Sequence, residues 1–91
     1  MEAKSFLIAA LYHFVNLEKI ENWQKKFQNI CTKNSLFGTI LIAPEGINGT
    51  IAGRQNNIIS FVTWLHQQTE FDNIDIKYSQ NNVCPFNRMK I

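Results

Sequence analysis

The chain has 91 residues with 45% apolar and 18% charged side chains, which supports one packed domain and excludes a disordered chain or a multidomain enzyme. No stretch approaches the roughly 20 apolar residues of a membrane span, and no cleavage pattern follows the apolar run Ser5–Phe14, so we expect no membrane association. A net charge of +2 permits nucleic-acid contact without requiring it, and two widely separated cysteines indicate a reduced, cytoplasmic protein.

The chain opens with a strand and a helix. The continuous apolar run Phe6–Tyr12 has strand length. Asn16 then offers an N-cap side chain, and apolar residues spaced three and four apart form one stripe from Leu17 to about Lys33. This spacing predicts a helix that buries one face.

A hairpin follows. Phe37–Ala43 predicts the second strand and Ile47–Gly53 the third. We expect the turn at Pro44–Gly46, because proline presets φ and glycine accepts a positive φ. The pair Asn48-Gly49 is also a hairpin signal, but a turn there would leave a long loop. Gly49 is therefore expected to mark a bulge or a close approach of the backbone.

The remaining elements complete a βαββαβ order. Apolar spacing predicts a second helix at Gln55–Gln68, and alternation predicts a fourth strand at Phe71–Tyr78. The order indicates the α+β class and a ferredoxin-like (acylphosphatase-like) sandwich: a four-stranded antiparallel sheet with two helices on one face. We assign residues 1–79 to this domain. Residues 80–91, with a solvated turn at Gln80–Asn82 and renewed alternation at Phe86–Ile91, are expected to form an exit segment into a further domain that is absent here.

The first two strands are apolar on both faces. In the first strand, one face carries Phe6, Ile8, Ala10 and Tyr12, and the other carries Leu7, Ala9 and Leu11. In the second strand, one face carries Phe37 and Leu41, and the other carries Ile40 and Ile42. Two helices cover only one face of such a sheet, so we expect another domain or another copy of the chain to cover the second face. The simpler alternative is that these strands tolerate exposed aliphatic side chains.

No catalytic constellation is evident. Cys31 lies on the buried stripe of the first helix, where a small hydrophobic residue is expected. Cys84 precedes a proline in a loop, with Arg88 and Lys90 as its only nearby cations. The histidines have no ligand spacing, so we predict no metal site, no cofactor and no catalytic residue in this chain.

Two functions known for this fold are also disfavoured. An acylphosphatase needs a phosphate-binding loop with an arginine after the first strand, whereas His13–Asn16 contains neither arginine nor glycine. An RNA-recognition motif stacks bases on aromatic residues of its first and third strands, but Ile47–Gly53 has no aromatic residue.

A set of motifs spans almost the whole chain: Ala10-Leu11-Tyr12-His13-Phe14, Cys31, Gly38-Thr39, the run Glu45-Gly46-Ile47-Asn48-Gly49-Thr50-Ile51-Ala52-Gly53, and Pro85-Phe86-x-Arg88-Met89-Lys90. With these motifs the sequence resembles the amino-terminal domain of the rhodanese-homology tRNA uridine hydroxylases of bacteria. The run that begins at Glu45 and the ending at Lys90 are the most specific parts of the resemblance.

The resemblance implies an enzyme that hydroxylates the wobble uridine of certain tRNAs to 5-hydroxyuridine, using molecular oxygen. The essential cysteine of that family belongs to a rhodanese-like domain, which would follow Ile91. The expected partners are therefore tRNA and an intramolecular rhodanese-like domain, and the expected place is the cytoplasm.

For this domain we expect a role in positioning tRNA and in packing against the catalytic domain. Arg88 and Lys90 on the exit segment are the predicted phosphate contacts, with Lys77 close by on the last strand. The residues expected at a domain interface or at the edge of the active site are Glu45, Gly46, Asn48 and Gly49. The alternatives are a non-enzymatic module that dimerises through the open sheet face, and part of a rhodanese-type sulfurtransferase.

Overall fold

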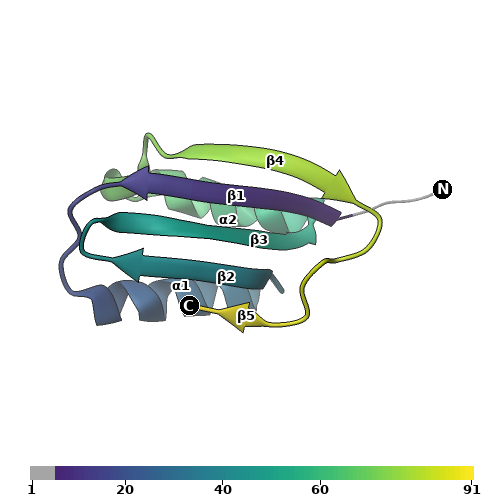
Figure 1. Cartoon of the computed structure of the whole chain (residues 1–91), viewed down its shortest axis with the longest axis horizontal. Helices are drawn as coiled ribbons and strands as arrows, with labels where there is room; N and C mark the ends of the chain where they lie inside the picture. Colours follow the sequence, from purple (N-terminus) through teal and green to yellow (C-terminus); the bar gives the residue numbers. More distant parts are fainter. Residues whose placement is uncertain (1–5) are drawn as a thin grey trace.

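Figure 1 shows the computed structural model of the protein, of which residues 6–91 are described. Ser5, the expected start of the first apolar run, lies outside the described residues. The elements are β1 (Phe6–Phe14), α1 (Ile20–Lys33), β2 (Phe37–Ala43), β3 (Gly46–Arg54), α2 (Gln55–Gln67), the 3-10 turn η1 (Thr69–Phe71), β4 (Asp75–Asn81) and β5 (Met89–Lys90). This order confirms the α+β sandwich.

The strands lie in the order β4-β1-β3-β2-β5, and both helices pack on the same face of the sheet (Figure 1). The pairs among β1, β2, β3 and β4 are antiparallel, as expected. The sheet nevertheless differs from the expected four antiparallel strands, because β5 adds a fifth strand parallel to β2. The Gly38 N–H donates to the Arg88 carbonyl oxygen at 2.7 Å. This pairing covers the edge of β2, which would otherwise present unpaired backbone groups.

Helix α1 begins later than the apolar spacing indicated. It starts at Ile20, and its N-cap residue is Lys19, which has a left-handed φ of 56° and makes no side-chain cap bond. Asn16 is therefore not the N-cap. Leu17 lies in the preceding loop, where it is buried and its N–H donates to the Pro44 carbonyl oxygen at 2.9 Å. Its apolar character serves the core and does not mark a helical turn.

The fourth strand also begins later, at Asp75. Phe71, the expected first residue of that strand, belongs to η1 and is fully buried. At the other end β4 extends to Asn81, so Gln80 belongs to the strand and not to a turn. Phe71 is apolar because it is buried as part of a turn, and it happens to extend the alternating pattern of the strand that follows. An alternating pattern in the sequence cannot distinguish such a turn residue from a strand residue.

The core between the helices and the sheet is dominated by aromatic rings. Phe27 of α1 packs edge to face with Phe61 of α2 and with Phe71, at centroid distances of 6.1 and 5.8 Å. Trp23 also meets Phe71 at 5.2 Å. Edge-to-face pairs of this kind stabilise a core beyond the area that they bury. They fix α1, α2 and η1 to the same face of the sheet.

The β2–β3 turn falls where the sequence placed it, with Ala43 paired to Gly46 across Pro44 and Glu45. Gly46 has a φ of +143°, and a Cβ at this position would overlap the His13 carbonyl oxygen of β1. Glu45 fixes the same corner, because its carbonyl oxygen accepts the Val15 N–H at 3.0 Å. The hairpin is thus tied to the β1–α1 loop through backbone contacts.

We expect Gly46→Ala to lower the free energy of unfolding by about 2–3 kcal/mol, because the alanine combines an unfavourable φ with a backbone overlap. Urea denaturation of both proteins measures the difference. Gly53→Ala is the matched control, since a Cβ there would meet a methyl group of the Leu36 side chain and overlap no backbone atom. Equal losses in the two variants would contradict this account of Gly46.

Candidate functional site

The face of the sheet opposite the helices carries large exposed side chains. Tyr12 is 57% exposed, Phe14 72% and Leu41 61%. On β3, Asn48 is the register partner of both Tyr12 and Leu41, and Gly46 is the register partner of Phe14. Figure 1 looks onto this open face, with the helices behind the sheet. The expectation that the first two strands are apolar on both faces is therefore confirmed.

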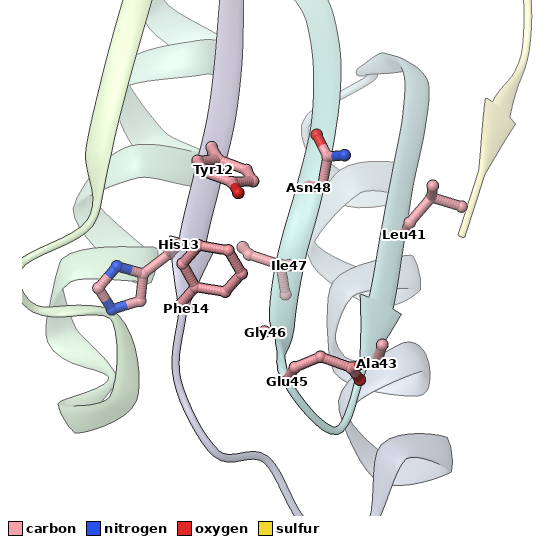
Figure 2. Close-up of a pocket in the computed structure, with 9 residues that line it drawn as sticks. All are labelled: Tyr12, His13, Phe14, Leu41, Ala43, Glu45, Gly46, Ile47 and Asn48. Atoms are coloured by element: carbon pink, nitrogen blue, oxygen red, sulfur yellow. The ribbon is translucent and has the colours of Figure 1, made fainter.

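A hollow of about 250 Å³ lies on this face beside the β2–β3 hairpin. Tyr12 and Phe14 border it from β1, while Leu41 borders it from β2 (Figure 2). Asn48 projects between them from β3 (Figure 2). His13 turns to the other side of the sheet, where its ring lies 6.1 Å from that of Phe71.

Two further hollows adjoin the first at Asn48. One is bordered by Leu41 and by Phe86 of the segment before β5, and the other by Tyr12 and the β4 residue Lys77. All three together are called the open-face groove here: its floor is Asn48–Thr50, and its walls are Tyr12 and Phe14 on one side and Leu41 and Phe86 on the other.

The structure brings together the four residues expected at an interface or active-site edge. Glu45, Gly46 and Asn48 border the hollow at the hairpin, and Gly49 belongs to the groove floor. Gly49 is paired without interruption to β1 and β2, so it marks no bulge. It does mark a close approach, because a Cβ at Gly49 would overlap the Thr39 carbonyl oxygen. Their functional role stays a prediction.

The three predicted phosphate contacts are divided between the two edges of the sheet. Arg88 and Lys90 border one hollow of about 240 Å³ beside β2. Lys77 is not close to them, because β4 and β5 are opposite edge strands. One row of register partners connects the two edges on the open face: Lys77, Ala10, Thr50, Thr39 and Lys90. Four steps between strands separate the Cα atoms of the two lysines by about 19 Å.

Three aromatic residues of this site, Tyr12, Phe14 and Phe86, were not among the site residues predicted from the sequence. Phe14 follows Tyr12 by two residues and shares its face, and the signal for it was the alternation that continues beyond Tyr12. Phe86 reaches the groove only because β5 returns to the edge of β2. No local pattern indicates that return.

The two cysteines differ in their burial. Cys31 is fully buried, and burial raises the pKa of its thiol to about 12. Cys84 is half-buried, and its Sγ lies 3.2 Å from the Phe86 carbonyl oxygen. Within residues 6–91 no three His, Cys, Asp or Glu side chains group in a way that would hold a metal ion. None of the helices in this part of the chain is long and apolar enough to cross a membrane.

Comparison with known sequences defines the family. Residues 6–91 match the UPF0176 acylphosphatase like domain. The chain belongs to this family. It is 45% identical over 86 residues to the tRNA uridine(34) hydroxylase of Rhizobium leguminosarum bv. trifolii, covering 94% of this chain and 28% of that protein. It is 41% identical over 88 residues to the tRNA uridine(34) hydroxylase of Bartonella quintana, covering 97% of this chain and 29% of that protein.

The chain thus spans less than a third of these curated relatives, in which the UPF0176 domain is one part of a longer protein. Solved structures support the fold alone. The acylphosphatase of Bacillus subtilis superposes with a TM-score of 0.60 at 19% identity, covering 96% of each chain. An acylphosphatase from Coxiella burnetii gives 0.59 at 9% identity, covering 94% of this chain and 90% of that one.

Burial of Cys31 predicts a pH dependence of stability. The unfolded chain loses the Cys31 proton near pH 9, whereas the folded chain keeps it until about pH 12. The contribution of the protonated Cys31 thiol to the free energy of unfolding is therefore complete below pH 9. The free energy of unfolding then falls by about 1.4 kcal/mol per pH unit between pH 9 and pH 12. Urea denaturation from pH 8 to 10.5 measures this slope.

Cys31→Ala is expected to flatten that slope while lowering stability at every pH, because it removes buried volume together with the thiol. Cys84→Ala, which removes a thiol outside the core, is the control and is expected to keep the wild-type slope. A Cys31→Ala slope equal to that of the wild type would contradict the assignment.

Proposed function

We propose that the UPF0176 domain described here is the accessory domain of a tRNA uridine hydroxylase, which makes 5-hydroxyuridine at the wobble position in the cytoplasm. The observation that carries this proposal is 45% identity over 86 residues to a protein named tRNA uridine(34) hydroxylase, of which the matched part is only 28%. A separate part of the protein, proposed to be a rhodanese-like domain with the essential cysteine, would then perform the chemistry.

The arrangement of the residues supports an accessory role. Cys31, the better shielded of the two thiols, is buried as core and held protonated, so it is not available as a nucleophile. The open face instead offers exposed aromatic and cationic side chains, which suit binding more than bond making. We assign to this domain the positioning of tRNA and the packing against the catalytic domain, with residues 80–91 as the connecting segment.

The hydroxylase proposal predicts a specific nucleoside change. Deleting the gene that encodes this chain is expected to remove 5-hydroxyuridine and nucleosides made from it at position 34 of tRNA. Mass spectrometry of nucleosides from purified tRNA measures this, with the complemented strain as the control. Unchanged wobble nucleosides accompanied by a loss of thiosulfate cleavage would instead support a sulfurtransferase.

The positioning role predicts a salt-dependent loss of affinity. Arg88→Ala with Lys90→Ala is expected to weaken tRNA binding more at low salt than at high salt, because each lost phosphate contact lowers the salt slope by about 0.7–0.9. Fluorescence anisotropy with labelled tRNA at several salt concentrations measures the slope.

The matched control for this pair is Lys25→Ala with Lys33→Ala, which removes the same charge from α1 on the other side of the sheet. If both pairs reduce the affinity and the slope equally, the effect is one of net charge and the assignment of Arg88 and Lys90 is wrong.

A further inference from the structure

We propose that the open-face groove binds an unpaired segment of RNA, with one base stacked on Tyr12 and Phe14 and the phosphates running toward Lys77 and Lys90. This inference rests on the proposed role in tRNA handling and adds the surface and the state of the RNA. The cations of residues 80–91 alone would bind the phosphates of any RNA, whereas the groove would bind only nucleotides whose bases are unpaired.

The aromatic wall has the properties of a stacking platform. Tyr12 and Phe14 are 57% and 72% exposed, and their ring centroids lie 5.1 Å apart at an interplanar angle of 70°. One ring therefore presents a free face beside the edge of the other. Exposed aromatic residues on an open four-stranded sheet stack two or three bases in other RNA-binding domains. Here the pair lies on a single strand, which concentrates the platform at the hairpin end of the groove.

The floor of the groove offers hydrogen bonds. Asn48 lies directly opposite Tyr12 in the register and borders all three hollows of the groove. Among the side-chain hydrogen bonds within residues 6–91, none involves Asn48. A primary amide has two donors and an acceptor, which match the donor and acceptor groups on the pairing edge of a base. That edge is accessible only in an unpaired nucleotide.

The charges define the path of the backbone. Lys77 and Lys90 lie at the two ends of one row across the sheet, with the hydroxyl groups of Thr50 and Thr39 between them. Two carboxylates border the groove but lie outside that row: Asp75, opposite Tyr12 on β4, and Glu45 in the hairpin turn.

Arg54 lies over the Phe6 ring at 4.5 Å, which places a further cation at the far end of the open face. A polyanion laid along the row from Lys77 to Lys90 thus meets a cation at each end.

The same groove is less suited to a second copy of the chain. A two-fold dimer through this face would pair the surface with itself, so the cations of Lys77, Lys90 and Arg54 would outnumber the carboxylates of Asp75 and Glu45 in each copy. The core of a protein interface is also more apolar than the rest of the surface, whereas this floor is Asn48, Gly49 and Thr50. Charge complementarity and a polar floor between aromatic walls favour RNA.

The test uses fluorescein-labelled octauridylate and the 91-residue chain at 50 mM salt. Tyr12→Ala is expected to weaken the Kd roughly 5- to 100-fold, the range for loss of one stacked base. Tyr12→Phe is expected to retain the wild-type Kd, because the ring is kept. The matched control is Tyr78→Ala: Tyr78 is 51% exposed, but its register partner Ala9 is fully buried, so it lies on the helix side of the sheet.

A blunt RNA duplex provides the second arm. It is expected to bind more weakly than octauridylate and to show no response to Tyr12→Ala. Several results would overturn the proposal: no octauridylate binding by the wild type, equal losses for Tyr12→Ala and Tyr78→Ala, or equal sensitivity of the duplex. Sedimentation that shows a wild-type dimer dissociated by Tyr12→Ala, with octauridylate binding unchanged, would assign the groove to a second copy.

The outcomes separate this inference from the hydroxylase proposal. Octauridylate binding that depends on Tyr12 supports the groove even if deletion of the gene leaves wobble uridines unchanged. Conversely, loss of wobble hydroxylation in the deletion strain, with octauridylate binding insensitive to Tyr12, supports the hydroxylase and overturns the groove.

Discussion

The fold depends on the passage of β3 between β1 and β2 with almost no side-chain volume at two positions. A Cβ at Gly46 would overlap the His13 carbonyl oxygen, and one at Gly49 would overlap the Thr39 carbonyl oxygen. Strand β3 pairs with β1 along its whole length, so both constraints act at the centre of the sheet. Loss of either close approach would separate the strands on which both helices pack.

The residue next to Gly49 belongs to the other side of the sheet. Gly49 pairs with the buried Leu11 and Ile40, so its position faces the helices, whereas Asn48 lies on the open face between Tyr12 and Leu41. The run from Glu45 to Thr50 therefore has two consequences at once, a tight backbone and a groove floor. Close backbone contacts require glycine at Gly46 and Gly49, whereas Asn48 is exposed and has no such structural requirement.

Much of the fold was accessible from the sequence, because local signals and tertiary contacts agreed there. Phe37–Ala43 was predicted with its observed bounds, since an apolar run ended at a proline turn. Prediction failed where tertiary contacts dominated. Leu17 and Phe71 extended the periodicity of neighbouring elements although they are buried loop and turn residues. The position of β5, and with it Phe86 at the groove, depended on a parallel pairing that no local pattern encodes.

The groove and the exit segment differ in how firmly the sheet holds them. The floor belongs to β3, which is paired on both sides, whereas Lys90 belongs to β5, which pairs with only Gly38 and Thr39. Elements with few backbone hydrogen bonds open locally at low cost, while central strands open only with the whole domain. In the proposed RNA complex, recognition of a base would therefore depend on the rigid centre of the sheet, whereas the phosphate contacts of Arg88 and Lys90 would depend on its most weakly held edge. This division would let these two cations adjust to the path of the RNA backbone while Tyr12 and Asn48 keep a fixed geometry.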